Sequence, residues 1–259
     1  MILEATAITK DFPQRTKRKI FRALDRVSFS LAEGEVLGIV GESGSGKSTL
    51  SEIAGGLLAP THGSVFYQGR DISSLQGEER KEFRRSVQFI FQSPRESMNP
   101  YFTIKSVLSE PLKINYPQMS GEEINRKISS MLTRVGMDPS NTLCYRPSHF
   151  SGGQLQRIAI ARSLLLSPRI LICDECTSSL DVSLQAQILN LLASLKKEIG
   201  LSMIFISHDI SVVRWISDRI MVLKDGVCVE SGSSDDVITE PENPYTKLLV
   251  ETSFLREKT

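Results

Sequence analysis

The sequence predicts an α/β protein in which helices wrap a mostly parallel β-sheet. Continuous apolar runs are typical of strands buried on both faces of such a sheet, and helical patterns separate these runs along the chain. The apolar runs cover residues 36–40, 87–91, 170–173 and 203–206. The N-terminal part alternates apolar and polar residues instead, which indicates an additional antiparallel β layer.

The alternation is clearest over residues 24–31, and Glu33-Gly34-Glu35 interrupts it. A strand with one buried face has this period of two. The apolar run 36–40 follows directly and leads into a Gly- and Ser-rich loop and then a helical pattern. We therefore expect the antiparallel layer to precede the first buried strand of the core.

Three later helices carry boundary signals. Ser120 and Glu123 have the spacing of a capping box at a helix start. Gly136, Pro168 and Gly200 each follow the apolar positions of one helix and stop it. The predicted helices cover about 121–135, 154–166 and 182–199.

Residues 93–165 are almost entirely helical or loop-like in pattern. We interpret them as a helical subdomain inserted into the core of a single domain that spans residues 1–259. Near the C-terminus, Asp225-Gly226 separates two β-rich runs, which is a strong signal for a two-residue hairpin. A C-terminal tail of about 231–259 follows.

Composition argues against several classes of protein. The 259 residues include 31 Lys and Arg against 30 Asp and Glu, so a net charge of +1 disfavours a nucleic-acid coat or a basic tail. The start of the chain lacks the pattern of a signal peptide, and no apolar run approaches the roughly 20 residues of a spanning helix. If the protein works at a membrane, we expect a partner to cross it.

Cys173 and Cys176 have the CxxC spacing found in zinc and redox sites. A zinc site needs a second pair of Cys or a paired His motif, and neither Cys144 nor Cys228 has a Cys or His close enough to supply one. The preferred interpretation is a set of reduced thiols, with the CxxC pair in a buried strand and its exit loop.

Residues 41–48, Gly-Glu-Ser-Gly-Ser-Gly-Lys-Ser, match the P-loop pattern GxxxxGK[ST] between a strand and a helix. In a P-loop, backbone N–H groups and the helix N-terminus surround phosphate oxygens. Lys47 is expected to reach the β- and γ-phosphates of ATP, and Ser48 to ligate Mg²⁺. The predicted binding residues are Gly41, Glu42, Ser43, Gly44, Ser45, Gly46, Lys47, Ser48 and Thr49.

An acidic pair, Asp174-Glu175, ends the apolar run 170–173. Asp174 is expected to hold the hydrated Mg²⁺, and Glu175 to polarise the attacking water as a base or orienting group. Such a pair is weak evidence alone, but together with a P-loop it predicts an ATPase.

Residues 150–157, Phe-Ser-Gly-Gly-Gln-Leu-Gln-Arg, resemble the Leu-Ser-Gly-Gly-Gln signature of ATP-binding cassette proteins. The resemblance covers nearly the whole chain, since six motifs occur in the family's order. It implies an ABC ATPase fold and ATP hydrolysis coupled to transport. It also implies that Gln92 contacts Mg²⁺ and water, that His208 binds the γ-phosphate, and that Asp181 lies at a subunit contact.

The signature has a physical interpretation too. Ser151 and the N–H groups of Gly152 and Gly153, followed by Gln154, stand at a predicted helix start, which attracts anions. In cassette ATPases the phosphate bound there belongs to the nucleotide of the opposite subunit. The resemblance therefore implies an obligatory second cassette, identical or paralogous.

The family also stacks an aromatic ring on adenine. Phe12 occupies the matching position, and Phe21 remains a competitor because the intervening loop is longer than usual. The basic residues of that loop predict a solvated surface: Arg15, Lys17, Arg18, Lys19 and Arg22.

Two positions depart from the family pattern. Phe150 replaces the usual Leu, and Cys176 replaces the Pro that usually follows the acidic pair. Neither replacement changes a group that contacts the nucleotide. We therefore expect them to affect the rate of ATP hydrolysis more than ATP binding. Without proline, the loop is expected to hold Glu175 less rigidly.

Residues 91–100 and the Pro-Tyr-Thr at 244–246 are similar to the peptide and nickel importer branch. This implies a peripheral subunit at the cytoplasmic membrane face, with two permease subunits, a second cassette and an extracytoplasmic binding protein that delivers peptide, nickel or a metal-chelator complex. Residues 93–165 would then dock the permease. A ribosome- or DNA-acting cassette ATPase and an exporter cassette are the alternatives. The solute itself leaves no mark on such a subunit.

Overall fold

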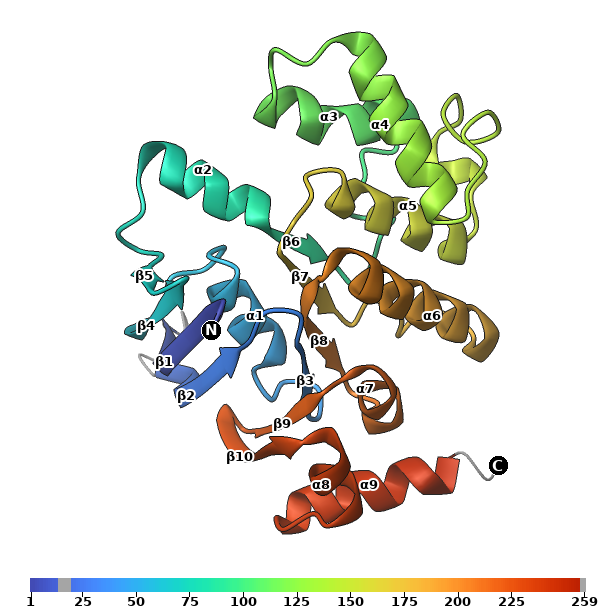
Figure 1. Ribbon diagram of the computed structural model, residues 1–259. Coiled ribbons are helices and arrows are strands. Elements are labelled where there is room, and N and C mark those ends of the chain that lie inside the picture. The colour runs from blue at the N-terminus through green and yellow to red at the C-terminus, as the bar shows by residue number, and fades with distance from the viewer. Residues whose placement is uncertain (14–19, 257–259) are drawn as a thin grey trace. The chain divides into compact units, whose positions relative to one another are not determined.

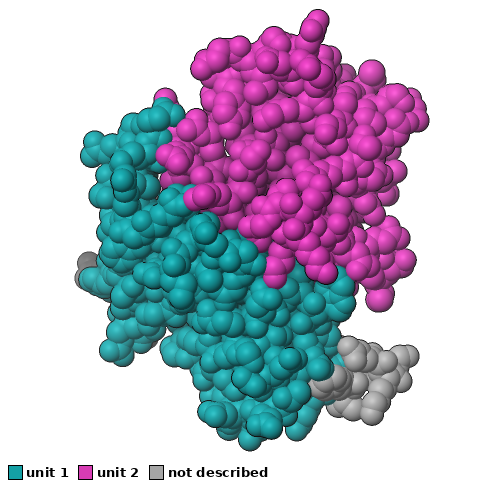
Figure 2. Space-filling view, viewed as in Figure 1, with its two compact units in different colours: residues 1–80, 202–259 teal, residues 81–201 magenta. Residues whose placement is uncertain are grey.

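The computed structural model describes the chain at residues 1–13 and 20–256. It has two compact units, Met1–Arg80 with Ser202–Thr259 and Lys81–Leu201 (Figure 2). The predicted insertion 93–165 falls within the second unit. Of the basic run, Arg15, Lys17, Arg18 and Lys19 lie outside the described residues.

The first unit contains the predicted antiparallel layer (Figure 1). Its strands are β1 (Leu3–Pro13), β2 (Ile20–Leu31), β4 (His62–Tyr67) and β5 (Arg70–Asp71), in the order β2-β1-β4-β5. In β2, Val27, Phe29 and Leu31 are buried while Ser28 is exposed. The alternation in the sequence therefore corresponds to a strand with one face on the core and the other toward solvent.

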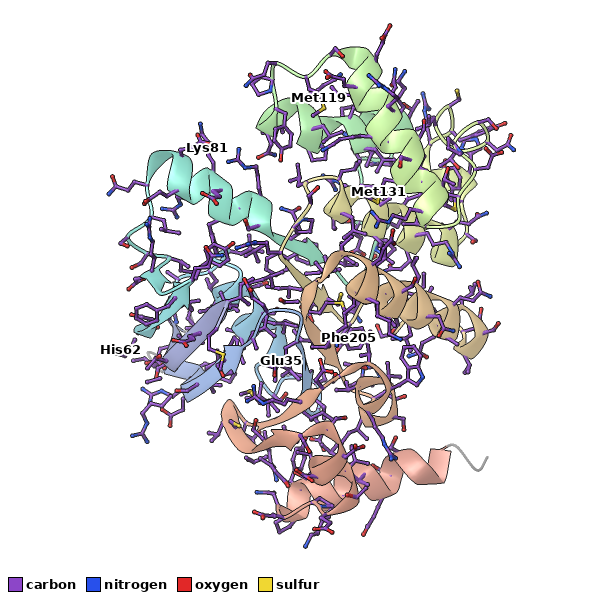
Figure 3. All side chains as sticks on the ribbon, viewed as in Figure 1. Glu35, His62, Lys81, Met119, Met131 and Phe205 are labelled. Atoms are coloured by element: carbon purple, nitrogen blue, oxygen red, sulfur yellow. The ribbon has the colours of Figure 1, made fainter. Side chains whose placement is uncertain are left out.

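The same unit holds parallel strands. β3 (Val36–Val40) lies between β8 (Ser202–Ser207) and β9 (Arg219–Lys224) and is parallel to both. Phe205 of β8, labelled in Figure 3, is fully buried. β10 (Val227–Ser233) returns antiparallel beside β9, which confirms the hairpin predicted at Asp225-Gly226.

The described part of this unit also contains the helices α1 (Lys47–Ala54), α7 (Ile210–Ile216), α8 (Ser234–Thr239) and α9 (Pro244–Arg256). α7 packs on β3 so closely that a Cβ added to Gly38 would lie 2.1 Å from Val213 Cγ1. The stretch predicted only as a tail thus contains α8 and α9.

The second unit has one parallel strand pair, β6 (Val87–Ile90) and β7 (Ile170–Asp174). Its helices are α3 (Ile104–Asn115), α4 (Gly121–Arg134), α5 (Gly152–Leu164) and α6 (Val182–Ile199), with a short 3₁₀ turn η1 (Pro147–His149). The chain enters this unit within α2 (Gly77–Ser86). The three predicted helices are confirmed, including the capping box of Ser120 and Glu123.

α5 is the central helix of the second unit, since it packs against β6, α3, α4 and α6. Most of its side chains are buried in consequence. Among the described helices, none combines the length and apolar character needed to cross a membrane.

The four cysteines are free thiols, and Cys173 and Cys176 are buried. The hydrogen bond with Cys176 and burial raise the pKa of the Cys173 thiol well above its ordinary value. A zinc site needs thiolates, and within residues 1–13 and 20–256 no group of three or more His, Cys, Asp or Glu residues could hold a metal ion.

Candidate nucleotide-binding site

The P-loop leaves β3 at Gly41 and ends where α1 begins at Lys47. The Lys47 ammonium donates hydrogen bonds of 2.8 Å to both the Gly41 and the Glu42 carbonyl oxygens. Its side chain is only 4% exposed, so these carbonyls compensate for the loss of water around the charge. The loop therefore folds around the cation that the sequence assigns to phosphate binding.

Backbone from two neighbouring segments fixes the shape of the loop. A Cβ added at Gly41 would lie 2.1 Å from the Leu223 carbonyl oxygen, and one at Gly46 would lie 2.7 Å from that of Ala23. The Gly226 N–H donates to the Ser45 carbonyl oxygen at 3.0 Å. Glycine is required where backbone approaches this closely, so the loop is held between β2 and the β9–β10 turn.

Gly226 offers a test of this close packing. It has a φ of +78°, and an added Cβ would lie 2.6 Å from the Ala23 carbonyl oxygen. We expect Gly226→Ala to lower the free energy of unfolding by about 2–4 kcal/mol, since backbone strain and a clash combine. Urea unfolding of the purified chain measures this.

Gly69 provides the matched control. Its φ is +76°, but an added Cβ would meet nothing within 4 Å. Gly69→Ala should therefore cost only the roughly 1–2 kcal/mol of the left-handed backbone. Equal losses in the two variants would contradict the close packing of the turn against Ala23 of β2.

The outer part of the loop is open. Glu42, Ser43 and Gly44 are exposed, and the Ser48 side chain is exposed in the first turn of α1, while Ser45 is buried. Thr49 follows in the same turn at intermediate exposure. An exposed hydroxyl at a helix N-terminus is a hard oxygen ligand of the kind Mg²⁺ takes.

His208 lies at the same sheet edge as the P-loop. Val40 of β3 pairs with Ser207 of β8 in parallel register, so Gly41 and His208 leave their strands side by side. The His208 side chain is exposed, and Asp209 next to it accepts a hydrogen bond from the Ser211 N–H at the start of α7. His208, the predicted γ-phosphate ligand, therefore lies at the edge of the sheet from which the P-loop starts.

In the second unit, Gln92 and Glu175 are brought together. Ile90 of β6 pairs with Cys173 of β7 in parallel register, and each predicted residue follows two positions later. The Gln92 amide nitrogen donates to a Glu175 carboxylate oxygen at 3.1 Å. The amide nitrogen also lies 3.4 Å from the Ser178 hydroxyl.

Glu175 has an unusual backbone, with a φ of 48° in the left-handed region. Such a conformation persists in a side-chain-bearing residue only where surrounding contacts enforce it. Ser178 supplies two of them, because its N–H and its hydroxyl both donate to the Glu175 carbonyl oxygen, at 3.1 and 2.9 Å. Cys176, in the position of the usual proline, is 1% exposed.

The predicted Mg²⁺ ligands are oxygen donors and so fit the metal chemically. Asp174 is the last residue of β7 and is partly exposed. The Gln92 amide nitrogen is turned toward Glu175, so a side-chain bond to Mg²⁺ would have to come from the Gln92 carbonyl oxygen.

The signature begins α5, as predicted. Ser151 is the N-cap residue, its hydroxyl accepts from the Gln154 N–H, and the Gln154 side chain accepts from the Ser151 N–H at 2.9 Å. The N–H groups of the first helical turn, including Gly152 and Gly153, lack acceptors within the helix. This end of α5 is therefore suited to bind an anion.

Two signature positions also have structural roles that sequence reasoning missed. A Cβ at Gly153 would lie 3.1 Å from Leu184 Cδ2, so this glycine lets α5 approach α6. Phe150, which replaces Leu, is buried at 8% exposure and fills an apolar position as Leu would. Asp181, predicted at a subunit contact, caps α6 by accepting from the Leu184 N–H at 2.9 Å.

The two candidate adenine-stacking rings are direct neighbours. Phe12 of β1 pairs with Phe21 of β2, which puts both side chains on one face of the sheet. Phe12 is partly exposed with the Lys10 ammonium 5.2 Å from its ring centre, and Phe21 is 49% exposed. Both aromatic residues therefore stay candidates for this contact.

Sequence reasoning missed one contact to the P-loop. The Glu42 N–H donates to the Tyr245 hydroxyl of α9 at 3.0 Å. The Pro-Tyr-Thr motif marked this tyrosine in the sequence, but 203 residues separate the two partners and no local pattern predicts their contact.

Comparison with known proteins agrees with these observations. The family described as ABC transporter matches residues 24–178. The chain is 47% identical over 232 residues to the oligopeptide transport ATP-binding protein OppF of Salmonella typhimurium, covering 90% of this chain and 69% of that protein. It is 46% identical over 255 residues to AppF of Bacillus subtilis, with 96% and 77% coverage.

Solved structures of cassettes are similar as well. The dimeric post-hydrolysis structure of the ATP-binding cassette MJ0796 with ADP and Pi has a TM-score of 0.80 at 33% identity, covering 90% of this chain and 98% of that chain. CbiO1 from Clostridium perfringens has a TM-score of 0.79 at 27% identity, covering 99% and 98%. With the P-loop, the acidic strand end and the signature all in place, this chain belongs to the ABC transporter family as one of its ATP-binding cassettes.

Proposed function

We propose that the chain binds and hydrolyses ATP to drive import of peptides through partner membrane subunits. The observation that carries the proposal is the 3.1 Å hydrogen bond between Gln92 and Glu175. Gln92 immediately precedes the helical segment 93–165, and Glu175 is the predicted catalytic carboxylate. The bond thus connects a docking segment to the hydrolytic group.

The chemistry begins with phosphate binding. The P-loop N–H groups and the N-terminus of α1 surround the phosphates, and the Lys47 ammonium turns from the Gly41 and Glu42 carbonyls to the β- and γ-phosphates. Phe12 or Phe21 stacks on the adenine. His208 donates a hydrogen bond to the γ-phosphate from the same sheet edge.

Hydrolysis then needs an oriented water. Glu175 accepts a proton from the water or orients it, and Gln92 holds the carboxylate in place for this task. Bound Mg²⁺ would neutralise charge that develops on the phosphates. Ser48, Gln92 and Asp174 are the residues that would hold it.

A second cassette completes the site. The anion-binding start of α5, at Ser151 to Gln154, needs a phosphate, and we assign it to ATP bound by the partner's P-loop. Asp181 would lie at the contact between the two cassettes. A partner of this kind fits the dimeric cassette structure that this chain resembles.

The names of the relatives support the proposed transport partners. OppF and AppF are named oligopeptide transport ATP-binding proteins. DppF of Escherichia coli, which is 44% identical over 253 residues, is named a dipeptide transport ATP-binding protein. We therefore place this chain at the cytoplasmic face of a membrane, bound to two permease subunits that receive solute from an extracytoplasmic binding protein. Peptide is the favoured solute over nickel or a metal-chelator complex.

Affinity purification of the chain in detergent tests the assembly. Recovery of polytopic membrane proteins together with a second cassette supports the importer. Recovery of ribosomes or DNA in their place would contradict it and favour the alternative of a cassette ATPase without a transport role.

Gln92 tests the coupling. In the purified transporter, Gln92→Ala should lower ATP hydrolysis by about 10-fold, because the carboxylate of Glu175 loses its hydrogen-bonded support. ATP affinity measured without Mg²⁺ should stay within about 2-fold, since the P-loop is unchanged. Gln76→Ala, at an exposed position of the first unit, is the control; equal turnover in both variants would contradict the role of Gln92.

A further inference from the structure

A single peptide unit of the P-loop is held from both ends by side chains. The Gly41 carbonyl oxygen accepts from the Lys47 ammonium at 2.8 Å. The N–H of the same peptide unit, which belongs to Glu42, donates to the Tyr245 hydroxyl at 3.0 Å. Rotation of this peptide would have to break both hydrogen bonds.

Several groups hold the Tyr245 side chain at this position. It is 7% exposed, and the Lys224 ammonium from the β9–β10 hairpin lies 4.7 Å from its ring centre. Burial raises the pKa of Tyr245 above its ordinary value, so its hydroxyl is neutral at physiological pH. A buried, neutral hydroxyl is a stable acceptor for a backbone N–H.

The start of α9 is itself anchored to β10. The Glu230 carboxylate accepts hydrogen bonds from the Glu242 N–H at 2.9 Å and the Asn243 N–H at 3.1 Å. The Asn243 side chain in turn accepts from the Tyr245 N–H at 2.9 Å. Although burial acts to raise it, the hydrogen bonds that Glu230 accepts lower the pKa of Glu230 overall, so this anchor is ionised at neutral pH.

The other half of α9 contacts the segment after His208. The hydroxyl groups of Ser253 and Ser211 lie 2.5 Å apart, and Ser211 stands in the first turn of α7. α9 thus touches both the P-loop and the helix that follows the predicted γ-phosphate ligand. The two α9 residues that make these contacts, Tyr245 and Ser253, lie beyond residues 24–178, where the family matches.

We propose that Tyr245 is a positioning residue for the nucleotide, one that keeps the Gly41–Glu42 peptide in its binding orientation when Lys47 turns to the phosphates. The inference rests on the proposed ATP binding by the P-loop. Without ATP, Lys47 and Tyr245 share the restraint. With ATP bound, Lys47 contacts the phosphates, so only the Tyr245 hydroxyl still holds the Gly41–Glu42 peptide. Loss of this hydroxyl therefore destabilises the ATP-bound state more than the nucleotide-free state.

The test is Tyr245→Phe, which removes only the hydroxyl. We expect the Kd for ATP with Mg²⁺ to rise about 3- to 10-fold, the range for one net hydrogen bond. In the assembled transporter KM for ATP should rise with kcat unchanged, because Glu175 and Gln92 are untouched. Hydrogen exchange at the Glu42 amide should become faster in the variant, while the Tm without nucleotide falls by no more than about 4 °C.

Tyr116→Phe is the matched control, since its ring faces the Arg85 and Lys127 cations in the second unit. It should leave ATP affinity unchanged. An unchanged Kd in Tyr245→Phe, or an equal rise in Tyr116→Phe, overturns the inference. If wild type binds ATP and Lys47→Ala loses binding while Tyr245→Phe does not, only this inference fails; if wild type binds no ATP, the proposed function fails.

Discussion

Glu175→Gln should slow ATP hydrolysis by roughly 10²-fold or more while ATP still binds, because a positioned general base contributes about 10²- to 10⁴-fold to such reactions. Glutamine has nearly the same size and its side-chain oxygen can still accept the hydrogen bond from Gln92, which is 3.1 Å long in the native chain. Its amide cannot accept a proton from water. Phosphate release at saturating ATP, measured beside the Kd for ATP, separates the two effects.

Because ATP stays intact in this variant, we also expect it to stabilise the complex of two cassettes. Light scattering with and without ATP measures this. Glu240→Gln, at an exposed residue after α8, is the control for loss of one carboxylate. Turnover within about 3-fold of wild type would contradict the role given to Glu175, since general-base loss costs far more.

Lys47→Ala should weaken ATP binding itself by about 10- to 100-fold, the range for one charge-assisted hydrogen bond. The substitution also removes the hydrogen bonds to the Gly41 and Glu42 carbonyl oxygens, which shape the loop. Isothermal titration with ATP and Mg²⁺ measures the change directly.

Lys197→Ala is the control for this variant, because it removes the same charge from an exposed position near the end of α6. It should bind ATP as wild type does. Near-wild-type affinity in Lys47→Ala would argue that the P-loop is not the phosphate site. If the free energy of unfolding falls by as much as the free energy of ATP binding, Lys47 has a structural role only.

Much of the fold and site follows from local patterns. The buried strands are short unbroken apolar runs, and Ser120 and Gly200 mark helix ends through capping chemistry that acts within a few residues. Even the pairing of Gln92 with Glu175 follows from parallel strands, because each lies two residues after a paired position at the ends of β6 and β7.

The elements that were missed lack such signals. α2 is strongly charged and buries only Phe83, so it has no apolar stripe to recognise. α7 has seven residues, too few for a period of 3.6 to repeat twice. The contact of Tyr245 with Glu42 depends on tertiary structure alone, since it joins residues far apart in sequence.

The left-handed backbone conformation of Glu175 could not be predicted from the sequence either. The sequence predicted that Cys176 in place of proline loosens this loop. The structure adds two hydrogen bonds from Ser178 to the Glu175 carbonyl oxygen, which restrain the loop without a proline ring. Turnover measurements on the native chain decide between these influences.

In the proposed function, ATP binds at the P-loop of this chain and the signature of a second cassette completes the site. A structure of the Glu175→Gln chain with ATP and its partner cassette tests this most directly. We predict the γ-phosphate next to Lys47 of one subunit and the start of α5 of the other. Phosphates bound away from residues 41–48, or a site completed within one chain, would contradict the account.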